Sequence, residues 1–90
     1  MNKTADDQGF QFPGVFEISA MGSADAGLEM AIPAALEAAG LRVHPETLSS
    51  RASSAGRFVC VRVQFHAEDR GEYEAAHAAL RAHPDVKWTL

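Results

Sequence analysis

The sequence is short of cysteine, of long apolar runs and of positive charge. Its single cysteine, Cys60, cannot form a disulfide within the chain, and no CxxC pair indicates a zinc or redox site. No run of about 18 apolar residues could cross a bilayer, and MNKTADDQGF lacks the apolar segment of a signal peptide. These absences predict a cytoplasmic protein in a reducing compartment, without contact with a membrane.

Basic side chains are outnumbered, with 8 against 12 acidic ones and a formal net charge of -4. Nucleic acids attract cationic surfaces, so the overall charge argues against them as partners. The 90 residues, 47% of them apolar, allow one domain with a single core. Residues 1–11 offer little apolar surface and are expected to form a disordered tail, which leaves a single domain at residues 12–90.

Six segments have the periodicity of regular secondary structure. Strands are predicted at residues 12–21, 46–52, 58–66 and 86–90, and helices at residues 25–39 and 69–83. This βαββαβ order, with right-handed crossovers, predicts a four-stranded antiparallel sheet with two helices on one face. The fold class is therefore α+β, a ferredoxin-like sandwich whose second sheet face is left open.

Alternation along the strands assigns the core to one side of the sheet. The residues expected to face the helices are Phe16, Ile18, Val59, Val61, Val63, Phe65, Val86 and Trp88. The segment 46–52 is mostly polar and is expected at an edge of the sheet. Pro33 would cost roughly 3 kcal/mol inside a helix, so we expect a kink or a late start in the first helix.

The ends of the two helices carry their own signals. Ser23 or Asp25 is expected to cap the first helix, and Gly40 is expected to end it. Asp69 lies three residues before Glu72, which is the spacing of a capping box at the start of the second helix.

The stretch AMGSADAGLE has two glycines in the position of a nucleotide-binding loop. A P-loop needs a lysine and a hydroxyl after its second glycine, whereas Leu28 and Glu29 follow Gly27. Gly22 is better explained as a turn residue. The histidines have no metal-ligand spacing and no nucleophile motif is present, so we expect no enzymatic activity, no metal and no cofactor.

A cluster of arginines marks the predicted hairpin. Arginine binds carboxylate or phosphate through two parallel hydrogen bonds, and serine hydroxyls lie among these arginines. The candidate ligand-binding residues of the hairpin are Arg51, Ser53, Ser54, Arg57 and Arg62. The functional interpretation is a site for an anion or an acidic partner, and the alternative is an ordinary solvated hairpin with a flexible tip.

The segment GRFVCVRV is faintly similar to the third strand of RNA-recognition motifs, which carries aromatic residues on the open face. Phe58 fits one stacking position, but Val15, Ser19, Cys60 and Arg62 supply no second aromatic platform. Single-stranded RNA binding is therefore kept as the alternative function.

The segments FPGVFEISAMG, SSRASSAGRF and VKWTL together resemble the YbeD-like family of small bacterial proteins, over residues 12–90. That family is similar in fold to ACT domains, which sense amino acids, regulate enzymes and commonly pair through sheet edges or helices. The resemblance implies a small regulatory or interaction module that senses an amino-acid-like molecule or docks a partner enzyme. It also implies that this module can form a homodimer. By the same analogy, a ligand near the turn into the first helix maps onto Gly22, Ser23 and Asp25.

Overall fold

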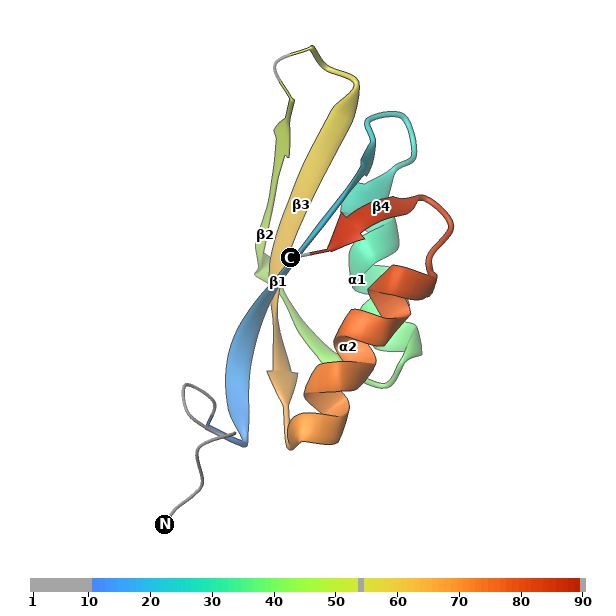
Figure 1. Cartoon of the computed structure of the whole chain (residues 1–90). Coiled ribbons are helices and arrows are strands. Elements are labelled where there is room, and N and C mark those ends of the chain that lie inside the picture. Colours follow the sequence, from blue (N-terminus) through green and yellow to red (C-terminus); the bar gives the residue numbers. More distant parts are fainter. Residues whose placement is uncertain (1–10, 54, 90) are drawn as a thin grey trace.

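The computed structural model describes residues 11–53 and 55–89, so the tail predicted at 1–11 lies outside them except for its last residue. Six elements follow one another: β1 (Gly14–Ser23), α1 (Leu28–Ala38), β2 (Arg42–Ala52), β3 (Phe58–Ala67), α2 (Arg70–Ala82) and β4 (Val86–Thr89). The strands form one antiparallel sheet in the order β2-β3-β1-β4, and both helices cover the same face of it (Figure 1). The predicted ferredoxin-like sandwich is confirmed.

The apolar stripe of β3 forms the middle of the core, as predicted. Val61, Val63 and Phe65 are fully buried beneath the helices. They meet a set of buried helix residues, Leu28, Ile32, Leu36, Ala76 and Leu80. Full burial of a large apolar side chain contributes about 1.5–3 kcal/mol, so this layer supplies most of the driving force for folding.

Aromatic side chains close the core at the beginning of β1. The ring of Tyr73, on α2, lies 5.1 Å from the ring of Phe16 and 6.3 Å from those of Phe12 and Phe65, measured between centroids. Such pairs add about 0.5–1.5 kcal/mol to the burial of their surfaces. These ring contacts hold the start of β1 against α2.

The first helix begins at Leu28, after the predicted residue 25, but Pro33 still lies inside it, so the late start does not remove Pro33 from the helix interior. Neither Ser23 nor Asp25 caps it, so that prediction is wrong. The chain first makes a turn closed by the N–H of Ala26 on the Ser23 carbonyl at 3.1 Å. It then enters the helix through Gly27, whose φ of 69° places it in the left-handed region without a side-chain cap.

Two other helix ends form as the sequence predicts. Gly40 ends α1 with a φ of 89°, and the N–H groups of Gly40 and Leu41 bond to the carbonyls of Glu37 and Leu36 at 2.9 and 3.1 Å. At the start of α2, the Asp69 carboxylate accepts the N–H of Glu72 at 2.9 Å. These bonds use backbone groups that a helix end leaves without partners.

The last strand contradicts one core assignment, because Trp88 does not face the helices. Gly22 lies opposite Val86 and Met21 opposite Trp88, so Lys87 is an extra residue in β4. A bulge of one residue reverses the side that the following side chains face. Val86 therefore packs against the core, while Trp88 lies on the open side of the sheet with 54% of its surface exposed.

Candidate functional site

The face of the sheet that the helices do not cover, here called the open face, carries side chains in rows set by the strand register. One row crosses all four strands, from Arg51 on β2 through Cys60 on β3 and Met21 on β1 to Trp88 on β4. Neighbouring strands lie about 4.8 Å apart, so the two ends of this cross-strand row are about 14 Å apart at the backbone. The row passes from a cation through two soft apolar side chains to an indole.

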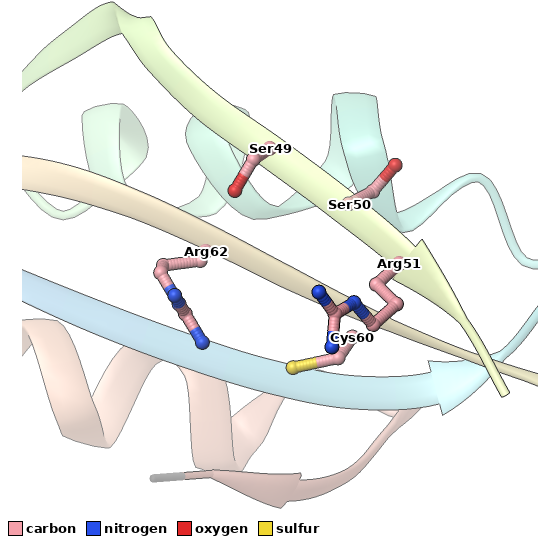
Figure 2. Close-up of a pocket in the computed structure, with 5 residues that line it drawn as sticks. All are labelled: Ser49, Ser50, Arg51, Cys60 and Arg62. Carbon is pink, nitrogen blue, oxygen red and sulfur yellow. The ribbon is translucent and has the colours of Figure 1, made fainter.

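Arg51 and Arg62 lie together at the cationic end of the open face. Figure 2 shows both guanidinium groups on the same side of the sheet with the Cys60 thiol between them. With Ser49 and Ser50 they line a surface depression of about 380 Å³. Of the predicted hairpin site, these two arginines are the pair that the fold brings together.

The position of Arg51 depends on a long irregularity in β2. This strand advances from His44 to Ser49 while β3 advances only from Gln64 to Arg62. The extra residues change which side chains of β2 point to each face of the sheet, so that Arg51 faces the same side as Cys60. β2 also begins at Arg42, earlier than the predicted residue 46.

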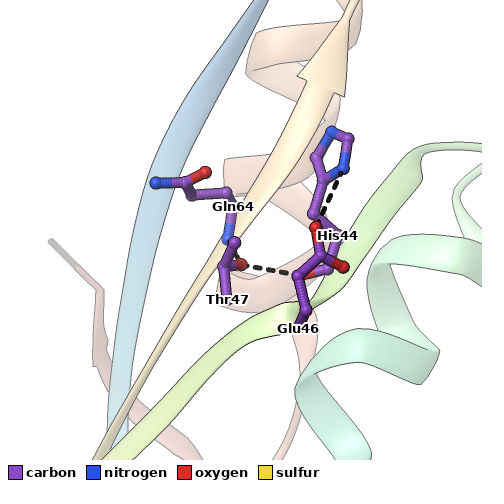
Figure 3. A network of polar contacts seen from close by, with 4 residues as sticks. All are labelled: His44, Glu46, Thr47 and Gln64. Carbon is purple, nitrogen blue, oxygen red and sulfur yellow. Dashed lines mark hydrogen bonds and ion pairs between the residues drawn. The ribbon is translucent and has the colours of Figure 1, made fainter.

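Thr47 holds this irregularity in place. Its hydroxyl donates to the His44 carbonyl at 2.6 Å and accepts the Gln64 N–H at 2.8 Å, in place of a backbone partner (Figure 3). Nearby, Nδ1 of His44 lies 3.8 Å from the Glu46 carboxylate. A side chain therefore satisfies backbone groups that the broken ladder would leave unpaired.

We expect Thr47→Val to lower the free energy of unfolding by about 1–3 kcal/mol, because it leaves a part-buried N–H without its acceptor. Thr47→Ser keeps the hydroxyl and is the matched control, with a loss well below that of the valine variant. Urea unfolding measures both. Equal losses for the two variants would show that the hydroxyl does not hold the strand.

The open face also carries an aromatic pair. The rings of Phe58 and Trp88 lie 5.8 Å apart between centroids, at 69° to each other. Sequence reasoning missed Trp88 as a second aromatic platform, because the bulge that turns it outward leaves no mark in VKWTL. The one available signal was Gly22, since a glycine inside a strand often marks a bulge.

The other hairpin candidates have structural contacts. Ser53 closes the turn, since its N–H donates to the Phe58 carbonyl at 2.8 Å and its hydroxyl accepts the Phe58 N–H at 3.2 Å. The carbonyl of Arg57 accepts the N–H of Ala24 at 2.9 Å, and its side chain is exposed. Ser54 lies outside the described residues. A ligand-binding role for these residues stays a prediction.

The turn from β1 into α1 lies at the same end of the sheet as the hairpin tip (Figure 1). A Cβ on Gly22 would lie 2.1 Å from the Asp85 carbonyl oxygen, so the close approach of the chain before β4 explains this glycine. Ser23 accepts the N–H of Ala26, and Asp25 is exposed. Ligand binding by Gly22, Ser23 and Asp25 stays a prediction as well.

Among the described residues of the helical layer, His77 is a titratable group with a shifted pKa. Burial, and secondly the nearby Arg81, lower the pKa of His77 on α2. Its ring packs 4.9 Å from that of Tyr73. Across residues 11–53 and 55–89, no group of three or more potential ligands is placed to hold a metal ion, and no helix is long and apolar enough to cross a membrane.

Comparison with known proteins finds relatives over nearly the whole chain. A family described as "Protein of unknown function (DUF493)" matches residues 7–90. UPF0250 proteins of Stenotrophomonas maltophilia and Xanthomonas oryzae are 57% and 54% identical over 84 residues, which cover 93% of this chain and 91% of each relative. The solution structure of protein HP0495 from H. pylori has a TM-score of 0.74 at 13% identity, over 100% of this chain and 94% of that one. At that identity the likeness concerns the fold alone.

Proposed function

We propose that this chain, which belongs to the YbeD-like DUF493 family of small bacterial proteins, is a non-enzymatic interaction module that binds an acidic ligand or partner on the open face of its sheet. One observation carries the proposal. Two arginines and two aromatic rings share a face that no described helix covers. A regulatory role would follow from docking on another protein.

The two arginines are available to a carboxylate. Among the described residues, no acid lies within ion-pair distance of Arg51. Arg62 lies 3.9 Å from Glu17, but both side chains are more than half exposed, and such pairs contribute little to stability. An incoming carboxylate can therefore replace Glu17 at low cost and gain charge-assisted hydrogen bonds.

The shape of the site favours a partner surface over an enclosed small-molecule pocket. The depression between the arginines lies on the sheet surface and not between two layers (Figure 2). Small ligands are usually bound in clefts that bury most of their surface. A small carboxylate remains the second form of the same proposal, because it would use the same guanidinium groups.

A thermal-shift experiment tests binding on the open face. The ligands are amino acids, dicarboxylates and poly-L-glutamate at low salt, and the proteins are the wild type, the double variant R51Q/R62Q and the control R81Q on α2. A ligand at about a hundred times its Kd adds about 2.7 kcal/mol of stability. We expect an acidic ligand to raise the Tm of the wild type and R81Q but not of R51Q/R62Q. A Tm unchanged by every acidic ligand would refute the proposal.

Single-stranded RNA binding is the second candidate, and the exposed position of Trp88 beside Phe58 favours it. Stacking of a base on an aromatic ring contributes about 1–3 kcal/mol. The net charge of -4 opposes it. Titration with oligouridylate at increasing salt separates the candidates, because RNA affinity falls steeply with salt. Absence of binding at low salt would remove this candidate.

A further inference from the structure

We propose that the occupant of the open face is an acidic, amphipathic α-helix of a partner protein. Its apolar side chains lie on Trp88 and Met21, and its carboxylates bind Arg51 and Arg62. The inference rests on the proposed function and adds the chemistry and the secondary structure of the partner.

The polarity of the cross-strand row sets the order of the partner's side chains. At one end, Trp88 is 54% exposed and Met21 is half-buried beside it. At the other end Arg51 and Arg62 flank Cys60 (Figure 2). A partner that matches this row presents an apolar group and a carboxylate about 14 Å apart, which corresponds to three strand spacings.

A helix suits this spacing and the chemistry of a sheet face. With a rise of 1.5 Å per residue, a span of about 14 Å corresponds to about nine residues, and residues i, i+4 and i+8 share one side of a helix. An extended peptide lying on the face would bury its own N–H and C=O groups without partners, because the sheet already uses its ladder bonds. A helix satisfies these groups internally, as α1 and α2 do on the other face.

The charge of the cross-strand row and of the neighbouring Arg62 selects an acidic helix. Among the residues paired between strands, the register places three arginines (Arg42, Arg51 and Arg62) and one glutamate, Glu17, on this face. The whole chain, by contrast, carries a net charge of -4. Two further acids each lie beside a histidine of this face: Glu68 by His66 at 2.6 Å, and Glu46 by His44 at 3.8 Å, in the β2 segment between the partners of Gln64 and Arg62. The cross-strand row itself holds no acid.

A second copy of this chain is a poor occupant of the same face. Symmetric pairing that stacks the Arg51 and Arg62 ends of two copies would bring four guanidinium groups together, and like charges oppose that contact. The helix α1 has acidic residues and the 81% exposed Met30, but it lies behind the sheet of its own chain. Docking it on the open face of a neighbour would give an open head-to-tail stack. A homodimer would therefore use the sheet edges or the helices.

Binding of designed peptides tests the inference directly. The first of four dye-labelled probes is a 15-residue peptide with leucine at i and i+4 and glutamate at i+8, repeated on one helical side. Two control peptides carry glutamine in place of glutamate or the same composition in scrambled order. The fourth probe is oligouridylate. Fluorescence anisotropy measures each Kd. Trp88, the single tryptophan of the chain, reports contact through its emission.

We expect the acidic amphipathic peptide to bind at least tenfold more tightly than the glutamine and scrambled peptides and to shift Trp88 emission to shorter wavelength. R51Q/R62Q and W88A should each weaken this binding at least tenfold, and R81Q should leave it unchanged. Equal binding of the scrambled peptide overturns the helix inference but leaves acidic binding intact. Absence of binding by all peptides and by polyglutamate overturns both. Tighter binding of oligouridylate assigns the face to RNA and overturns the inference.

Discussion

Replacing Phe65 with alanine is expected to lower the free energy of unfolding by about 3–5 kcal/mol, the largest effect of any single truncation considered for this chain. Phe65 has no exposed surface, and its ring lies 6.2 and 6.3 Å from the rings of Phe16 and Tyr73. The change leaves a cavity where β1, β3 and α2 meet. A small domain with a total stability of about 5–15 kcal/mol would retain little of it.

Phe58→Ala is the matched control for Phe65→Ala, because it removes the same group from the same strand on the opposite face. Phe58 is half-buried and packs on Trp88, so we expect a loss of about 1 kcal/mol. Guanidinium unfolding measures both losses. Phe65→Leu provides a milder change if the alanine variant does not fold. Similar losses at the two positions would mean that the faces of the sheet are wrongly assigned.

The sequence predicts the parts of the fold that a local pattern specifies. The alternation of β3 identifies its buried stripe, and Gly40 and Asp69 mark helix ends through contacts a few residues away. The start of α1 is different. Its approach through Gly27 depends on the path of the preceding loop, which the hairpin fixes through the bond between the Ala24 N–H and the Arg57 carbonyl.

The candidate site could be predicted only in part, for the same physical reason. Composition identifies a cluster of arginines, but which of them share a face depends on the irregularity that Thr47 holds in β2. Likewise, Trp88 reaches the open face through a bulge beside Gly22. Both irregularities are set by contacts between strands, and a period of two read along one strand contains no information about them.

Replacing Gly22 with alanine is expected to lower the free energy of unfolding by about 3 kcal/mol, at the upper end of the range for overpacking. The added Cβ would lie 2.1 Å from the carbonyl oxygen of Asp85 and 2.8 Å from Cδ1 of Leu28. The oxygen belongs to the backbone, so β4 must move away from β1 to make room. This movement displaces Trp88, and we expect its emission to change as well.

Gly56→Ala separates this steric effect from the conformational freedom of glycine. Gly56 has a φ of 73°, and among the described residues other than its chain neighbours no atom lies within 4 Å of an added Cβ. Alanine there therefore costs only the left-handed strain of about 1–2 kcal/mol and leaves Trp88 emission unchanged. Thermal and urea unfolding give both losses, and fluorescence gives the second readout. If Gly56→Ala costs more than Gly22→Ala, the approach of the chain before β4 is not what requires glycine at position 22. The bulge that turns Trp88 outward would then need another cause.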